Sequence, residues 1–266
     1  MRDRLDALLV ARGVFASRSR AQAAVIAGDV RVDGETVRRP AARVDPDVDV
    51  TVAARPRFVS RGGDKLAHAL DALGVDVEHE EACDIGSSTG GFVDCLLQRG
   101  ATAVVAVDVG YGQLDWTLRQ DPRVTVLERT NARTLTAERL PFRPTFVTAD
   151  VSFISLTLAL GPVLEFARSG HRGMALVKPQ FEAGRERVGK GGVVRDRAVH
   201  VDVLKRIAVW LAARGEAVLG ICDSGHPGPK GNVEYFIYYA DDGSAPAAAR
   251  VDAAAAARRA VEEAHG

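Results

Sequence analysis

Two lysines and two acidic residues, widely separated in the sequence, have the types needed to move a proton: Lys65, Asp150, Lys178 and Glu234. A neutral lysine amine can take up the proton of a hydroxyl nucleophile, and a carboxylate beside it can orient the amine. Asp150 and Lys178 directly follow short apolar runs, and Glu234 lies at the start of another. If these runs are strands of one parallel sheet, the charged side chains meet at its carboxyl rim. Each also has an ordinary explanation, since such lysines are usually solvated and such aspartates often cap helices.

A glycine-rich stretch, residues 81–92, follows the pattern of a nucleotide-cofactor loop. Residues 82–85 can form a buried strand, after which Gly86 lets the backbone turn sharply. Gly90 and Gly91 keep side chains away from a ligand at the N-terminus of the following helix. Glycine-rich turns are also built for packing alone, so the pattern by itself leaves both explanations open.

The spacing around this loop indicates which cofactor it binds. The next apolar run, residues 103–107, ends in Asp108, whose carboxylate can accept hydrogen bonds from both hydroxyls of a nucleoside ribose. A dinucleotide site carries a glycine where this chain has Ser88, because a pyrophosphate approaches the backbone there. The pattern D-x-G-x-x-x-G-G is the form seen in S-adenosylmethionine methyltransferases. We therefore expect S-adenosylmethionine, and we disfavour a nicotinamide-dependent oxidoreductase.

Alternating strands and helices over residues 61–243 predict an α/β domain with a parallel sheet covered on both faces. Together with the cofactor pattern, this favours the Rossmann-like fold of class I methyltransferases. The expected strands are 82–85, 103–107, 124–127, 145–148, 174–177, 217–222 and 233–239. The expected helices are 61–74, 92–99, 113–119, 154–168 and 198–214. A loop without a helix leads into the last strand, which should run antiparallel in an otherwise parallel seven-stranded sheet.

Residues 1–54 predict a small α+β module ahead of this domain. Apolar stripes within residues 5–9 and 21–25 indicate two short helices, and Ser17 offers an N-cap for the second. Alternating residues over 30–37, with an Asp-Gly turn between them, predict a hairpin.

Arginines on this module, including Arg4, Arg18 and Arg20, could bind phosphate groups. Acidic residues nearly balance them in number, so a solvated surface of mixed charge would explain them equally well on its own. The module, however, resembles the S-four RNA-binding domain. The matching motifs are R-L-D-x-L-L-V at 4–10, S-R-S-R-A at 17–21 and V-x-V-D-G at 30–34. The resemblance implies an RNA partner, with arginines giving affinity and register rather than base specificity.

Two segments outside these domains are harder to assign. Residues 55–60 form the predicted linker, because Pro56 disfavours a helix at the residue before it. Arg57 and Phe58 in this linker could contact RNA by charge and stacking, although a plain spacer fits as well. Residues 244–266 are rich in alanine and offer no other apolar face, so we expect a loosely held tail and assign it no function.

The bulk composition excludes several classes. The 266 residues carry no net formal charge, so an RNA partner must be argued from local clusters. The three cysteines form no C-x-x-C pair and the six histidines are scattered, which supports neither a disulfide framework nor a metal site. The N-terminus is too polar for a signal peptide, and nothing approaches the apolar length of a membrane span. We expect a cytoplasmic protein; the sequence does not fix its oligomeric state, and we favour a monomer.

The whole pattern resembles the TlyA family, in which an S-four domain precedes an FtsJ-type methyltransferase domain. Seven ordered motifs carry the resemblance. They are V-S-R-G-G-D-K-L at 59–66, D-I-G-S-S-T-G-G-F at 84–92, D-V-G-Y-G-Q-L at 108–114, A-D-V-S-F-I-S at 149–155, L-V-K-P-Q-F-E at 176–182, G-G-V-V-R-D at 191–196 and G-N-V-E-Y-F at 231–236. Chance similarity over so many ordered motifs is excluded.

The resemblance implies roles for individual residues. The family's catalytic Lys-Asp-Lys-Glu tetrad corresponds to Lys65, Asp150, Lys178 and Glu234. The residues that would contact the cofactor are Asp84, Gly86, Ser87, Gly90, Gly91, Phe92, Asp108, Val109, Asn131 and Asp150.

The resemblance also implies an activity: 2'-O-methylation of cytidine ribose in ribosomal RNA of the large subunit and, given the long tail, of the small subunit. Such methylation is expected to affect sensitivity to capreomycin-type antibiotics. Two alternatives stay open at this point. One is a non-catalytic RNA-binding or ribosome-assembly protein that retains a cofactor fold, and the other is a membrane-active hemolysin, a label that family members carry.

Overall fold

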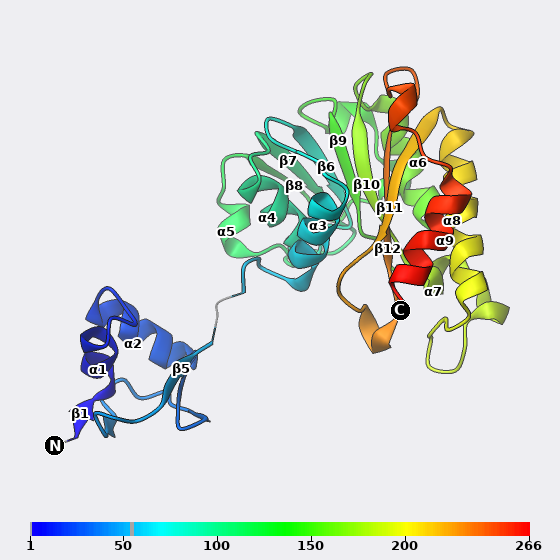
Figure 1. Cartoon of the computed structure of the whole chain (residues 1–266). Coiled ribbons are helices and arrows are strands. Elements are labelled where there is room, and N and C mark those ends of the chain that lie inside the picture. The colour runs from blue at the N-terminus through cyan, green and yellow to red at the C-terminus, as the bar shows by residue number, and fades with distance from the viewer. Residues whose placement is uncertain (1, 54–55) are drawn as a thin grey trace. The chain divides into compact units, whose positions relative to one another are not determined.

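The computed structural model describes residues 2–53 and 56–266. They form two compact units, Met1–Pro56 and Arg57–Gly266 (Figure 1). Residues 54–55, at which the first domain was predicted to give way to the linker, lie outside the described residues. Each unit has a hydrophobic core of its own.

The first unit packs two helices beside short strands, as predicted. Its elements are β1 (Asp3–Arg4), α1 (Leu5–Ala11), α2 (Arg18–Ala27), β2 (Val30–Val32), β3 (Glu35–Thr36), β4 (Arg43–Val44) and β5 (Val50–Val52). Ser17 caps α2, because its hydroxyl accepts a hydrogen bond from the backbone N–H of Arg20 at 3.4 Å. The predicted hairpin is β2–β3, and it turns at Asp33 and Gly34, which both have positive φ.

Seven strands form the sheet of the second unit, in the order β11-β12-β10-β9-β6-β7-β8 (Figure 1). They are β6 (Glu81–Ile85), β7 (Ala103–Val107), β8 (Val124–Leu127), β9 (Phe146–Ala149), β10 (Arg172–Val177), β11 (Glu216–Asp223) and β12 (Tyr235–Asp241). β12 pairs antiparallel with both of its neighbours, whereas the pairs from β10 to β8 are parallel. The predicted sheet with an antiparallel last strand is confirmed.

Helices cover both faces of this sheet, because its strands are apolar on both sides. Along β7, for example, Val104 and Ala106 join one core and Val105 and Val107 the other. The first core includes α3 (Arg61–Ala72) and α4 (Gly91–Gln98), and the second includes α6 (Leu156–Phe166), α8 (Arg197–Ala212) and α9 (Ala253–Glu263). Two short helices, α5 (Trp116–Arg119) and α7 (Pro179–Glu182), complete the set of α-helices in the part that the structure describes. No helix in that part combines the length and apolar character that crossing a bilayer requires.

The C-terminal residues form a docked helix, so the prediction of a loosely held tail is wrong. α9 packs against β11 and α8 (Figure 1). Its buried face consists of Ala256, Ala257, Ala260 and Val261. Each alanine removes little apolar area from water, but small side chains on one face let the helix approach the sheet closely. The chain ahead of α9 also pairs with β11, because the Val251 N–H donates to the Val218 carbonyl oxygen at 3.1 Å.

This docking predicts that two identical substitutions in α9 have different effects. Ala257 is 0% exposed and Ala255 is exposed. We expect Ala257→Asp to lower the free energy of unfolding by about 3 kcal/mol or more, because it buries a carboxylate without a partner. Ala255→Asp should change it by less than about 0.5 kcal/mol. Urea unfolding of both variants measures the difference, and equal effects would show that α9 is not docked in solution.

Candidate active site

The four charged residues singled out from the sequence lie around one cavity of the second unit. Lys65 is on α3, Asp150 and Lys178 directly follow β9 and β10, and Glu234 directly precedes β12. All four line a cavity of about 330 Å³, which we call the tetrad cavity. Strands that end at the same edge of the sheet therefore bring together residues that are distant in the sequence.

Within the tetrad cavity each lysine is paired with a carboxylate. The Lys65 Nζ lies 2.6 Å from Glu234 Oε2, and the Glu234 side chain is completely buried. The Lys178 Nζ forms an ion pair with Asp150 and donates a hydrogen bond to the Ser152 hydroxyl at 3.0 Å. Because a buried charge without its partner is costly, each lysine and its carboxylate hold one another in place. Sequence reasoning missed the contact with Ser152.

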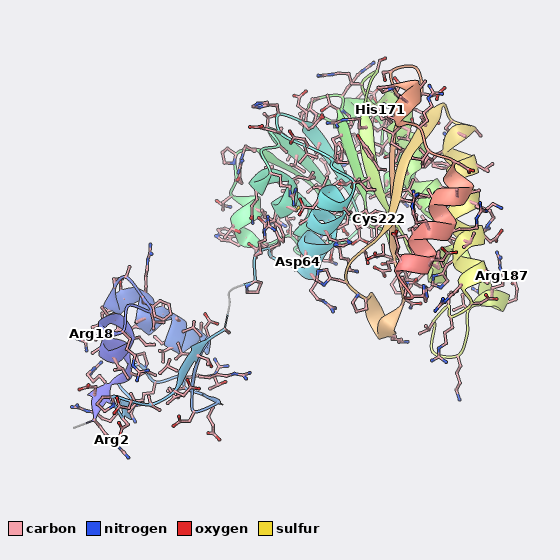
Figure 2. All side chains as sticks on the ribbon, viewed as in Figure 1. Arg2, Arg18, Asp64, His171, Arg187 and Cys222 are labelled. Atoms are coloured by element: carbon pink, nitrogen blue, oxygen red, sulfur yellow. The ribbon has the colours of Figure 1, made fainter. Side chains whose placement is uncertain are left out.

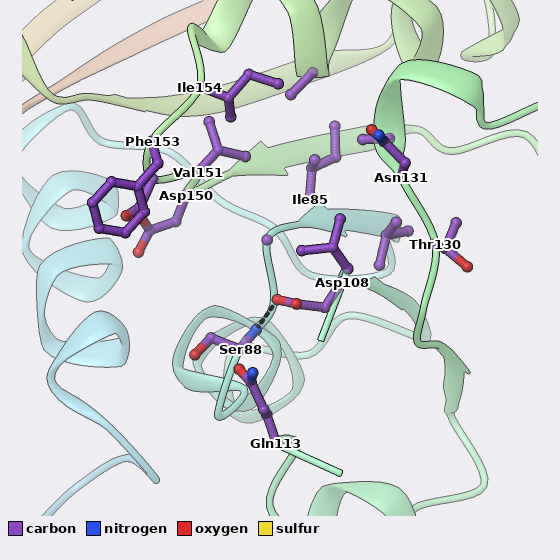
Figure 3. A pocket seen from close by; sticks show the side chains of 16 residues that line it. Ile85, Ser88, Asp108, Gln113, Thr130, Asn131, Asp150, Val151, Phe153 and Ile154 are labelled. Atoms are coloured by element: carbon purple, nitrogen blue, oxygen red, sulfur yellow. Dashed lines mark hydrogen bonds between the residues drawn. The ribbon is translucent and has the colours of Figure 1, made fainter. Parts of the chain in front are cut away.

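A second cavity, of about 400 Å³, lies beside the first and is lined by the ends of β6, β7 and β9 (Figure 3). We call it the Asp108 cavity. Gly86, Ser88 and Asp150 line both cavities. The Asp108 carboxylate accepts a hydrogen bond from the Ser88 backbone N–H at 2.7 Å (Figure 3). It accepts another from the Gly110 N–H, also at 2.7 Å, and the two bonds fix its orientation. Val109 and Asn131, both predicted to contact a cofactor, also line this cavity.

The glycines of the loop are needed for different reasons. Gly86 has φ of +83°, and a Cβ on it would lie 2.3 Å from the Asp150 carbonyl oxygen. A Cβ on Gly90 would meet the Leu118 side chain at 2.4 Å, and one on Gly91 would meet the Ser60 hydroxyl at 2.2 Å.

For Gly90 the expected reason is therefore corrected, because the Leu118 side chain and not a ligand fills the space that a side chain would take. Among the described residues, Gly90 is not one of those that line either cavity, whereas Gly91 lines the tetrad cavity. Ser87 and Phe92 are buried and line the tetrad cavity as well. The Phe92 ring packs against Phe236, with centroids 5.7 Å apart.

Asp84 is a buried carboxylate with one unsatisfied oxygen. Its side chain is 1% exposed, its Oδ1 accepts a hydrogen bond from the Thr148 hydroxyl at 2.7 Å, and its Oδ2 has no partner among the described residues. The pKa of Asp84 is raised to about 7, chiefly by burial and also by the negative charges of Asp150 and Asp108, while the Thr148 hydrogen bond opposes the shift. A cation bound in the tetrad cavity would find an acceptor there.

The arginines predicted to bind RNA do not share one environment. Arg4 and Arg18, the latter on α2 (Figure 2), both form ion pairs with the buried Asp6, at 2.9 and 3.1 Å. Gln22 also donates a hydrogen bond to that carboxylate, and hydrogen bonding from Arg4 contributes most to holding the pKa of Asp6 well below its usual range. Arg4 and Arg18 therefore support the fold of the first unit, a role that sequence reasoning missed, while Arg20 is exposed on α2.

The prediction that Phe58 stacks on RNA is wrong. Its side chain is 2% exposed, and a Cβ on Gly63 of α3 would lie 2.3 Å from it, so the ring is buried against that helix. Arg57 is exposed, and its guanidinium lies 4.9 Å from the Phe58 ring centroid. Arg57 stays a predicted RNA contact.

An aromatic residue that sequence reasoning missed lies at the mouth of the Asp108 cavity. Phe153 is 92% exposed and has φ of +64°, an unusual conformation for a bulky residue. Its ring contacts Phe181, with centroids 5.0 Å apart. Backbone strain of this kind is often found at functional sites. In the sequence, the only indication of a role for Phe153 was its position within the A-D-V-S-F-I-S motif, two residues after Val151.

Comparison with known proteins decides the family. Residues 58–240 match the family model described as FtsJ-like methyltransferase, and residues 3–50 match the S4 domain. The chain belongs to the FtsJ-like methyltransferase family.

Its relatives show that the chain belongs, within the FtsJ-like methyltransferases, to the TlyA family. YqxC of Bacillus subtilis is 50% identical over 239 residues, which cover 89% of this chain and 85% of the relative. A Mycobacterium tuberculosis protein named 16S/23S rRNA (cytidine-2'-O)-methyltransferase TlyA is 46% identical over 239 residues, 89% of each chain. The structure of a hemolysin-named protein from Streptococcus thermophilus has a TM-score of 0.75 at 38% identity, and covers 99% of this chain and 96% of that chain.

The family implies S-adenosylmethionine as the methyl donor, and the residues of the site fit this molecule. The unsatisfied Asp84 Oδ2 is an acceptor suited to the ammonium of its methionine part. Asp108 is held at the end of β7, where its carboxylate can accept ribose hydroxyls. The two cavities meet at Gly86, so they offer adjoining space for the two halves of one ligand.

The raised pKa of Asp84 predicts a pH-dependent stability in the absence of ligand. Because this pKa is raised from 3.8 to about 7, the contribution of Asp84 is fully present below about pH 4 and is lost as the pH rises through about 7. We expect Asp84→Asn to be more stable than the natural protein at pH 8, by up to about 4 kcal/mol, and to lose this advantage on acidification. Urea unfolding between pH 5 and pH 8 measures it. The matched variant Asp115→Asn, whose carboxylate has a lowered pKa, should show no gain at pH 8.

Proposed function

We propose that the protein transfers a methyl group from S-adenosylmethionine to the 2'-hydroxyl of cytidines in ribosomal RNA of the large subunit and also of the small subunit. One observation carries this proposal: two lysine–carboxylate pairs line a cavity that adjoins the Asp108 cavity. The names of relatives support the substrate, since TlyA of Mycobacterium tuberculosis is named for both RNAs and TlyA of Campylobacter jejuni for the 23S RNA. Sensitivity to capreomycin-type antibiotics would follow the methylation.

The cofactor would be held by residues of both cavities, with Asp84 accepting from its ammonium and Asp108 from its ribose. Bound there, S-adenosylmethionine supplies a methyl group that is already electrophilic. The protein must then orient an oxygen nucleophile and remove its proton.

The tetrad supplies these two actions. A ribose hydroxyl is a poor acid, so an amine placed beside it must accept the proton or stabilise the alkoxide as it forms. Lys178 can do this because Asp150 and Ser152 fix its amine at the end of β10. Lys65, held by Glu234, adds a second positive charge to the same cavity.

The RNA would be engaged by both units. Arg20 offers an exposed guanidinium on the S4 domain, where phosphate contacts give affinity. At the mouth of the Asp108 cavity, the exposed Phe153 ring offers a surface on which an unpaired base can stack. Ribosomal RNA is thus the proposed partner. In this proposal, the nucleotide that receives the methyl group is unpaired and unstacked from its neighbours in the RNA.

Methyl transfer to purified ribosomal subunits tests the activity. We expect labelled methyl from S-adenosylmethionine to appear at cytidine riboses, and Lys178→Ala to reduce the rate at least about hundredfold because the amine that handles the proton is gone. Lys205→Ala, which removes an exposed lysine of α8, is the matched control and should keep the full rate. RNA binding without any methyl transfer would contradict the proposal and favour a ribosome-assembly protein.

Substitution of two arginines of α2 should distinguish a role in RNA binding from a role in the stability of the first unit. Arg20→Ala should weaken RNA binding and lower the slope of log K against log salt by about one, with unchanged stability, because one phosphate contact is lost. Arg18→Ala should also destabilise the first unit, because it removes a partner of the buried Asp6. Filter binding at several salt concentrations and thermal unfolding measure both effects. An Arg20→Ala protein that binds RNA normally would remove this arginine from the interface.

A further inference from the structure

The loop between β11 and β12 lies over the most deeply buried member of the tetrad. Glu234 is 0% exposed, and both of its carboxylate oxygens are engaged. Oε2 lies 2.6 Å from Lys65 Nζ, and Oε1 accepts a hydrogen bond from the Gln180 amide at 3.3 Å. The position of this carboxylate therefore decides where the Lys65 amine is held.

Gly228, in the middle of this loop, touches the same carboxylate. A Cβ on Gly228 would lie 2.1 Å from Glu234 Oε1 and 2.5 Å from its Cδ, far closer than atoms can approach. Gly228 is not among the glycines with positive φ, so its φ angle does not itself require glycine. What excludes a larger residue is the lack of space beside the Glu234 carboxylate.

The loop has little freedom to move away and make room. Its turn is closed by backbone hydrogen bonds from Gly228 N–H to the Asn232 carbonyl at 2.8 Å and from Gly231 N–H to the Gly228 carbonyl at 3.1 Å. The Asn232 side chain anchors the end of the turn, because it donates to the Gly192 carbonyl at 2.9 Å and accepts from the Val194 N–H at 3.2 Å. An added methyl group would therefore displace the carboxylate rather than the loop.

We propose that Gly228 and Gln180 are positioning residues for Glu234 and, through it, for Lys65. Gly228 limits the carboxylate from one side by excluded volume, and Gln180 holds the same Oε1 by donating a hydrogen bond. Neither residue belongs to the tetrad or has a group that takes part in methyl transfer. This inference rests on the proposed function, because it assigns a role toward the same reaction.

The inference predicts a specific loss in Gly228→Ala. The Glu234 side chain rotates away, Lys65 loses its 2.6 Å partner, and the rate of the chemical step falls on the order of tenfold to hundredfold. Affinity for S-adenosylmethionine and for RNA stays close to that of the natural protein, whereas the thermal unfolding temperature falls, because a buried carboxylate loses its partner. Gln180→Leu should show the same pattern with a smaller loss, because its hydrogen bond is long.

Single-turnover methylation, cofactor titration and a crystal structure of Gly228→Ala together test the proposal. Gly243→Ala is the matched control, since Gly243 also lacks a positive φ and a Cβ there would have only an ordinary contact, 3.5 Å from Asp241. Combining Gly228→Ala with Glu234→Asp supplies the decisive comparison. The shorter side chain no longer reaches the added methyl group, so Gly228→Ala should cost little further rate in the Glu234→Asp protein.

The outcomes are distinct. A full rate in Gly228→Ala, an unchanged Glu234–Lys65 distance in its crystal structure, or the same rate loss in both backgrounds would overturn the proposal. Absence of methyl transfer in the natural protein would instead overturn the proposed function, and the distance measured in the crystal would still report whether Gly228 positions Glu234.

Discussion

The ion pair between Lys65 and Glu234 links the two ends of the methyltransferase domain. Lys65 lies on the helix before the first strand of the sheet, and Glu234 lies directly before the last, 169 residues along the chain. Burying both charges is costly unless their geometry is nearly ideal, so the surrounding elements must fit closely. The pair stabilises the domain only once the whole sheet has formed, which makes assembly of the site a consequence of complete folding.

The site also concentrates negative charge, because three neighbouring strands end in or contain carboxylates. Asp84, Asp108 and Asp150 repel one another, and the effect is visible in the raised pKa of Asp84. Only Asp150 has a lysine as an ion-pair partner among the described residues. Without a ligand, the repulsion among these carboxylates is unfavourable, and a bound cationic cofactor would reduce it. The attraction for a sulfonium compound thus arises from the same burial that makes the free site costly.

The sequence predicted a mostly parallel sheet with an antiparallel last strand, and the meeting of the tetrad at its edge, because strand alternation and strand ends are local signals. It could not reveal contacts that depend on packing in three dimensions. Phe58 looked like an exposed aromatic of a basic linker, and only the close approach of Gly63 shows that it is buried. The alanines of α9 were misjudged because small side chains carry a weak pattern, although Asp252 caps this helix in an ordinary way. Gly90 was placed beside a ligand, since sequence does not distinguish space kept for a cofactor from space filled by Leu118.

The docked C-terminal segment also bears on solubility. β11 is an edge strand of the sheet, and an uncovered edge offers unpaired backbone groups to strands of other molecules. The Val251 N–H donates a hydrogen bond to one of these groups, the Val218 carbonyl, and α9 packs against the same strand. A chain shortened before Val251 would therefore leave the edge of β11 uncovered, and an uncovered edge favours pairing with strands of other molecules.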